Sequence, residues 1–145
     1  MSVTAKWYGK ALLNQWGSAP INWTADTIKV ALCTSSYTPD QDNHTFFSDI
    51  TNEITGTGYT AGGSQLTTPA KTYTGATNVV MLDADDVAWS NASITARYAI
   101  VYKSTGVAGT SQLMGYVDFG QDITSTAATF TISWDSAGIF TITPA

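Results

Sequence analysis

The fold is decided by residues 94–103, which read Ile-Thr-Ala-Arg-Tyr-Ala-Ile-Val-Tyr-Lys. Apolar side chains recur here at every second position, a period that places them on one face of a β-strand. The positions concerned are Ile94, Ala96, Tyr98, Ile100 and Tyr102. The stretch therefore predicts the longest strand of the chain.

Shorter segments of the same kind lie on both sides of this strand, with turns rich in Gly, Asp and Ser between them. We expect strands at residues 27–34, 71–74, 78–82, 87–89, 112–119, 129–134 and 139–143. No long helical pattern separates them, which argues against a parallel α/β sheet. The sequence predicts an all-β fold, an antiparallel β-sandwich or barrel of about seven to eight strands.

Two of these segments predict which side chains share a face. In residues 27–34, positions 28, 30 and 32 should point one way and positions 29, 31 and 33 the other. In residues 112–119, Leu113, Val117 and Phe119 are expected on one face.

The segment Thr4 to Trp16 is the one with helical spacing, because Trp7, Leu12 and Trp16 fall on a rough apolar face. Thr4 is expected to cap this short N-terminal helix, and Gly17 to end it.

The chain is expected to be a single domain over residues 1–145, with a helical arm at 1–26 and a β core at 27–145. The arm would either lie on the sheet or dock on a neighbouring subunit. Two exposed Trp side chains are unfavourable in a free monomer, so something should cover them.

The charge and composition of the chain indicate which classes of partner to expect. The net charge is −5, and six Lys and Arg are scattered along the chain, so no nucleic-acid partner is expected. Charged residues make up only 12% of the chain, whereas about 25% is usual. A surface with few charges loses little solvation when protein docks on it. We therefore expect protein partners, including other copies of this chain.

The first residues carry no apolar run typical of a signal peptide, and no apolar run approaches the roughly 20 residues of a membrane span. We expect assembly in a cytoplasm and no membrane partner. Cys33 is the single cysteine, so no internal disulfide is expected.

Candidate catalytic and ligand-binding groups are few. A Cys33–His44 dyad is conceivable, but Cys33 falls within a strand pattern typical of a buried thiol. Glu53 is the single glutamate, with no acidic partner indicated for glycoside hydrolysis. Residues 56–61 match the pattern G-x-G-x-x-[GA], yet glycines and no helix follow. We expect no enzyme, no catalytic residue and no cofactor.

Two acidic loops, at residues 40–43 and 83–86, are the candidates for calcium. Neither matches an EF-hand, and Asp side chains commonly bond nearby backbone amides in turns. Turn formation is the favoured interpretation, and no metal is expected.

The aromatic side chains indicate either packing or recognition. The candidate partner contacts are Trp7, Trp16, Trp23, Tyr37 and Tyr59. A sugar-stacking platform is the alternative role, for which the candidates are Trp23, Tyr37, Tyr59, Tyr73, Tyr102 and Tyr116.

Four segments resemble a recurring type of small protein in tailed-bacteriophage genomes. They are residues 28–42 (IKVALCTSSYTPDQD), 52–63 (NEITGTGYTAGG), 94–102 (ITARYAIVY) and 115–120 (GYVDFG). The resemblance runs from about Lys6 to Phe140 and implies a virion structural protein without catalytic residues. A capsid decoration, or cement, protein that binds the major capsid protein or other virion proteins is the first expectation. A tail, neck or host-adhesion component and a carbohydrate-binding module are the alternatives.

Overall fold

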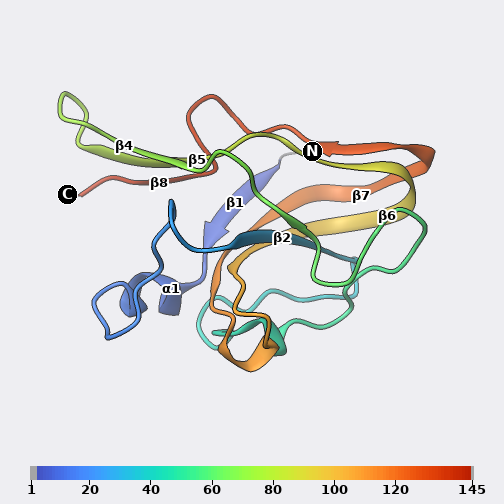
Figure 1. Ribbon diagram of the computed structural model, residues 1–145, viewed down its shortest axis with the longest axis horizontal. Helices are drawn as coiled ribbons and strands as arrows, with labels where there is room; N and C mark the ends of the chain where they lie inside the picture. Colours follow the sequence, from blue (N-terminus) through green and yellow to red (C-terminus); the bar gives the residue numbers. More distant parts are fainter. Residues whose placement is uncertain (1–2, 145) are drawn as a thin grey trace.

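The computed structural model describes residues 3–144, which form two antiparallel sheets packed as an open sandwich (Figure 1). One sheet has the strand order β1-β7-β6-β2-β3, and the other has the order β4-β5-β8. The strands are β1 (Thr4–Trp7), β2 (Ile28–Cys33), β3 (Ser64–Gln65), β4 (Ala70–Thr74), β5 (Val79–Asp83), β6 (Val87–Lys103), β7 (Leu113–Ile132) and β8 (Phe140–Ile142). The helical elements are α1 (Gly9–Asn14), η1 (Phe47–Asp49) and η2 (Ala108–Thr110). The predicted all-β sandwich with one short N-terminal helix is confirmed, and the sheets do not close into a barrel.

The hairpin of β6 and β7 organises the molecule, because its strands of 17 and 20 residues are the longest. Figure 1 shows this ribbon curving so that its far end runs back over the five-stranded sheet. The bend falls where the pairing is irregular, between Ala96 and Tyr98 of β6. Gly120 of β7 lies here with φ of 79°, a left-handed conformation that glycine adopts without strain. The Arg97 Nε donates a hydrogen bond of 2.6 Å to Asp118 across the two strands at this point.

Two buried clusters lie on opposite faces of the five-stranded sheet. The main core fills the space between the sheets and includes Val30, Leu32, Ile94, Val101 and Phe130. The second cluster, called the tyrosine core here, lies on the other face. Its members are Tyr8, Ala11, Ala31, Cys33, Tyr37, Ile100, Tyr102, Leu113 and Tyr116.

Strand β2 follows its predicted pattern. Ile28, Val30 and Leu32 belong to the main core, whereas Ala31 and Cys33 belong to the tyrosine core. Both faces of β2 are therefore buried, as expected of a strand inside a sheet with apolar layers on both sides.

The apolar side chains of β6 do not share one face, so that prediction is wrong. Ile94 and Ala96 lie in the main core, whereas Ile100 and Tyr102 lie in the tyrosine core and Tyr98 packs against it. A β-bulge reverses the faces that successive side chains occupy. The irregular step after Ala96 is such a reversal.

The prediction of one face for Leu113, Val117 and Phe119 is also wrong. Leu113 lies in the tyrosine core, and Val117 lies in the main core with Phe119 packed against it. The β6–β7 register shifts between the pairs Val101–Gly115 and Tyr102–Leu113, which reverses the faces again.

The N-terminal prediction is half correct. Helix α1 is present and ends before Gly17, but Thr4 starts β1 and caps no helix. Val3, Ala5 and Trp7 alternate with Thr4 and Lys6, and the free edge of β7 offers these residues a partner. Pairing with an existing strand outweighs a weak helical pattern in so short a segment.

Among the described residues, no helix combines the length and the apolar character needed to cross a membrane.

Candidate functional site

The Cys33 thiol and the His44 imidazole lie in different surroundings. Cys33 is 0% exposed, and burial raises the pKa of its thiol to about 12, so it stays protonated near neutral pH. His44 Nδ1 accepts a bond of 3.3 Å from the Asp40 amide and lies 2.8 Å from the Tyr37 hydroxyl. Within residues 3–144, no hydrogen bond joins Cys33 to His44.

The His44 ring terminates a buried chain of hydroxyl groups. Since Nδ1 accepts from an amide, Tyr37 donates to it, and Tyr8 in turn donates to Tyr37 over 2.7 Å. Burial raises the pKa of both Tyr8 and Tyr37, so both hydroxyls stay neutral. This chain of hydrogen bonds lets polar groups lie inside the tyrosine core without an unpaired donor.

The first acidic loop uses its carboxylate for turn formation. Asp40 Oδ1 accepts bonds of 3.0 Å from the backbone amides of Asp42 and Asn43. The side-chain amide of Asn43 also donates to Asp40, and this bond is the main reason that the pKa of Asp40 is lowered. The geometry fits the turn interpretation.

The second acidic loop tethers neighbouring segments. Asp85 Oδ2 accepts from the hydroxyls of Thr67 and Thr68, and Asp86 Oδ1 accepts from the Trp134 amide. The part of the chain that the structure describes contains no group of three or more side chains that could hold a metal ion.

Glu53 fastens the glycine-rich loop to the sheet. Its Oε1 accepts from the Tyr59 hydroxyl at 2.7 Å and from the Gly62 amide at 2.6 Å. Gly63, with φ of 74°, lies so close to the Val30 carbonyl oxygen that a Cβ would collide with it. Strand β3 follows this loop, so the helix N-terminus that a dinucleotide requires does not follow it.

The five candidate partner contacts do not form one surface. Trp23 is buried and donates its Nε1 proton to the Asp83 carbonyl over 2.9 Å, and Tyr37 is buried in the tyrosine core. Burial and internal hydrogen bonds therefore already engage these two rings within the chain. Trp7 packs on Phe140, and Tyr59 bonds to Glu53. Trp16 alone among the five is exposed, by 89%.

The proposed sugar platform is also mostly internal. Four of its six rings are buried, and Tyr59 is half-buried. Tyr73, on β4, is the one largely exposed member. A flat stacking surface needs several rings in solvent, which this group does not present.

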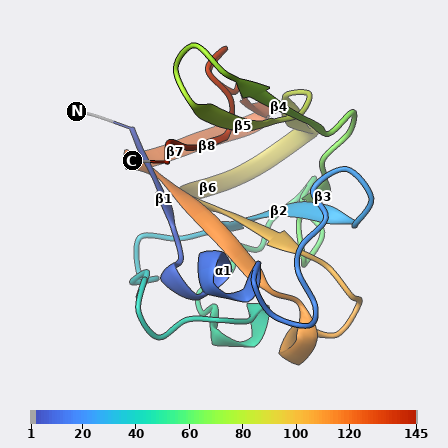
Figure 2. The same cartoon turned by 90° about the vertical axis from the view of Figure 1, so that its left-hand side faces the viewer.

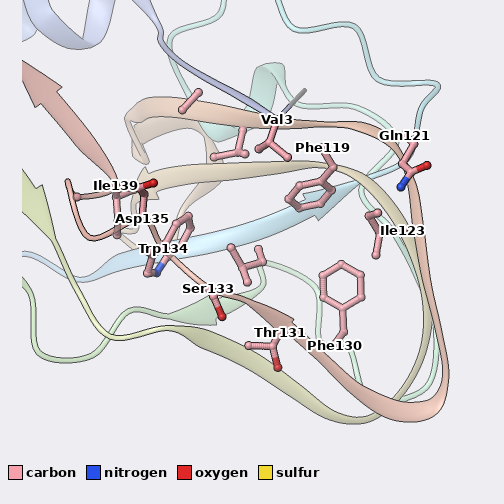
Figure 3. A pocket seen from close by; sticks show the side chains of 14 residues that line it. Val3, Phe119, Gln121, Ile123, Phe130, Thr131, Ser133, Trp134, Asp135 and Ile139 are labelled. Atoms are coloured by element: carbon pink, nitrogen blue, oxygen red, sulfur yellow. The ribbon is translucent and has the colours of Figure 1, made fainter. Parts of the chain in front are cut away.

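An apolar groove of about 840 Å³, the β7 groove, opens at one end of the main core (Figure 3). It lies inside the bend of β7, so residues before and after the bend face each other across it. Val3 and Ala5 border it from the N-terminal strand. The apolar side chains that line it are Val3, Val117, Phe119, Ile123, Phe130, Ile132, Trp134 and Ile139.

The rings at the closed part of the groove are partly covered. Phe119 and Phe130 lie with their centroids 6.3 Å apart, and Figure 3 shows both, with Ile123, turned toward the hollow. Phe130 is buried, whereas Phe119, Ile123 and Trp134 are half-exposed. The main core is thus open to solvent at this end.

The open end coincides with a free strand edge. β1 pairs with β7 over residues 115–118. The remaining edge, residues 119–132, has no strand partner among the described residues. Free edges beside apolar surface are sites at which proteins add a strand or a side-chain anchor from a partner.

Acidic side chains rim one end of the groove. Asp135 borders it, and Asp86 is bonded to the Trp134 amide; both carboxylates are in exposed residues. Asp85 is exposed beside them, and its carbonyl accepts from Trp134 Nε1 over 3.1 Å. The groove is therefore apolar inside and negatively charged at this rim.

A second apolar feature, the α1 knob, consists of Leu13 and Trp16, which are 69% and 89% exposed. The Trp16 amide bonds to the Leu13 carbonyl, so the helical turn continues and places both side chains on one side. Lys10 precedes Leu13 by three residues on the same side and is exposed.

Trp16 was among the contacts predicted from the sequence, whereas the groove was not predicted. Its lining comes from segments up to 136 positions apart, Val3 to Ile139. Phe119 ends the strand predicted over residues 112–119, and Ile123 lies in residues 120–128, for which no strand was predicted, whereas β7 runs without a break from Leu113 to Ile132. Gly120 was the available signal, because a glycine inside a strand often marks a bend.

Comparison with models of known protein families, with curated proteins and with solved structures finds no match to this chain.

Proposed function

We propose that this chain is a structural subunit of a tailed-phage particle that works by docking on other protein, with capsid decoration as its first role. One observation carries the proposal. The main core is open to solvent at the β7 groove, although the rest of this core is buried. An open apolar groove with a free strand edge is typical of an interaction site.

The surface composition agrees with this role. Only 12% of the residues are charged, so a docking partner would displace water from few full charges. The resemblance of four segments to small tailed-phage proteins is the reason for proposing that the partner belongs to a phage particle. On a capsid lattice, symmetry would repeat each weak contact many times, and this avidity would stabilise the shell.

The thiol and carboxylate groups that were candidates for catalysis support a docking role more than an enzymatic one. The Cys33 thiol is buried, and the Asp40, Asp85 and Glu53 carboxylates each accept hydrogen bonds that fasten loops. Their positions are explained by the stability of the fold.

Quantitative mass spectrometry of purified particles tests the proposal. A decoration protein is expected at a copy number comparable with that of the major capsid protein, and cryo-electron microscopy should place it on the outer face of the head. A few copies per particle would favour a tail, neck or adhesion component. Absence of the chain from washed particles would contradict a structural role.

A further inference from the structure

We propose that copies of this chain associate head to tail, with the α1 knob of one copy inserted into the β7 groove of the next. The inference rests on the proposed function and deepens it, because it names a second copy as an occupant of the groove.

The two surfaces match in polarity. The knob presents two large apolar side chains, Leu13 and Trp16, to solvent. The groove encloses about 840 Å³ between Phe119, Ile123 and Trp134, within the roughly 300–1,000 Å³ of pockets that bind compact apolar ligands. Trp is among the residue types enriched at the energetic anchors of protein interfaces.

The two surfaces also match in charge. The first 16 residues contain Lys6 and Lys10 but no acidic residue. Asp135 borders the groove, and Asp86 accepts a hydrogen bond from the amide of Trp134, which lines it; both Asp residues are exposed. Lys10 lies on the same side of the helix as the knob, so insertion would bring it toward these carboxylates. Attraction of this kind orients a complex and excludes the reverse orientation, which would place like charges together.

The placement of the two surfaces fixes the kind of assembly. Val3, at the groove, immediately precedes β1, and α1 follows its other end (Figure 2). The four residues of β1 span roughly 13 Å, so one copy presents knob and groove in different places. A contact between unlike surfaces leaves one knob and one groove free. It therefore continues into a ring or an open chain and does not stop at a twofold dimer.

Analytical ultracentrifugation of three purified chains tests this arrangement. The wild-type chain is expected to form oligomers that grow with concentration. Trp16→Ala removes the knob, and Ala5→Trp fills the groove from an exposed position on β1. Each variant alone should be monomeric, with association weakened at least roughly 30-fold, as for a central Trp anchor.

Mixing the two variants gives the decisive result. The Ala5→Trp copy keeps its knob and the Trp16→Ala copy keeps its groove, so the mixture should form a 1:1 heterodimer and nothing larger. Tyr73→Ala, at an exposed aromatic on β4, is the matched control and should leave the oligomers unchanged. If Ala5→Trp does not fold, Ile123→Glu places a charge inside the same groove.

Other outcomes overturn the inference. A twofold dimer that survives Trp16→Ala would indicate pairing of β7 edges, and a wild-type chain that stays monomeric would exclude self-association. In the second case, a high copy number in particles would leave the proposed function intact. Conversely, head-to-tail oligomers of a chain that particles lack would reject the proposed function and keep this inference.

Discussion

The two buried clusters of this protein are closed in different ways. The tyrosine core is covered by α1 and by the loop that carries η1, and the hydroxyls of Tyr8 and Tyr37 end on the His44 ring. The main core is open at the β7 groove, where Phe119 and Trp134 are partly exposed. The chain thus covers the tyrosine core on one face of the sheet, whereas it leaves one end of the main core exposed on the other face. The difference indicates that the sealed cluster maintains the fold, whereas the open end is available to a partner.

Truncation of a ring in each region should show the largest contrast. Tyr8 is 0% exposed, so Tyr8→Ala is expected to lower the free energy of unfolding by about 3–5 kcal/mol. Phe119→Ala at the groove should lower it by only about 1–2 kcal/mol, because part of that ring already contacts water. Urea denaturation measures both. Equal losses would mean that the groove is as closed in solution as the tyrosine core.

The loop over the tyrosine core depends on one carboxylate. Asp49 Oδ2 accepts from the amides of Thr45 and Phe46 over 2.8 and 2.9 Å. Asp49→Ala leaves both donors unpaired and should lower stability by about 1–2 kcal/mol. Circular dichroism during urea titration gives this loss, and the neighbouring exposed Ser48→Ala is the control. A loss as small as that of the control would show that the loop does not help to seal the cluster.

The same carboxylate predicts a dependence on pH. The Phe46 and Thr45 amides lower the pKa of Asp49 in the folded state. A group whose folded pKa is lowered contributes stability that is present above its ordinary pKa, about 3.9, and is lost as the pH falls through the folded value. The urea midpoint should therefore fall below about pH 4, and less so in Asp49→Ala. An identical acid dependence in both proteins would contradict the assignment.

The hydroxyl chain should make a smaller contribution. Tyr37→Phe keeps the ring but removes the donor to His44 and the acceptor for Tyr8, so stability should fall by about 0.5–1.5 kcal/mol. Thermal unfolding measures the change, with Tyr73→Phe as a control on an exposed ring. No loss at all would mean that water replaces the bonds and that the cluster is less sealed than its geometry indicates.

The smallest effect on stability is expected at the α1 knob. Trp16 is almost fully exposed, so Trp16→Ala in dilute, monomeric protein should change the free energy of unfolding by less than about 0.5 kcal/mol. Thermal unfolding at low concentration checks this value. A larger loss would place Trp16 in the fold and remove it from the set of available contacts.

The sequence by itself determined the class of fold and much of its strand layout. Alternation in residues 27–34 predicted β2 and which of its side chains share a face, and the strands predicted at 71–74 and 78–82 are the paired strands β4 and β5. Low charge and the aromatic N-terminal segment predict a protein partner, and this stays a prediction; Trp16, one of the five candidate contacts, is 89% exposed. These properties are local, because strand periodicity and turn chemistry act over a few residues.

Tertiary structure alone decided the faces of β6 and β7, the strand at residues 4–7 and the lining of the groove. The β6–β7 register shifts near Arg97, between the pairs Ala96–Ile123 and Tyr98–Asp118, and the faces of β6 reverse there; the spacing of apolar side chains does not reveal this shift. Residues 4–7 became a strand because β7 offered a free edge, which depends on a segment more than 100 positions away. The groove also depends on distant segments: Gly120 signals a bend in β7, but the residues that line the groove after the bend come from positions far apart in the sequence.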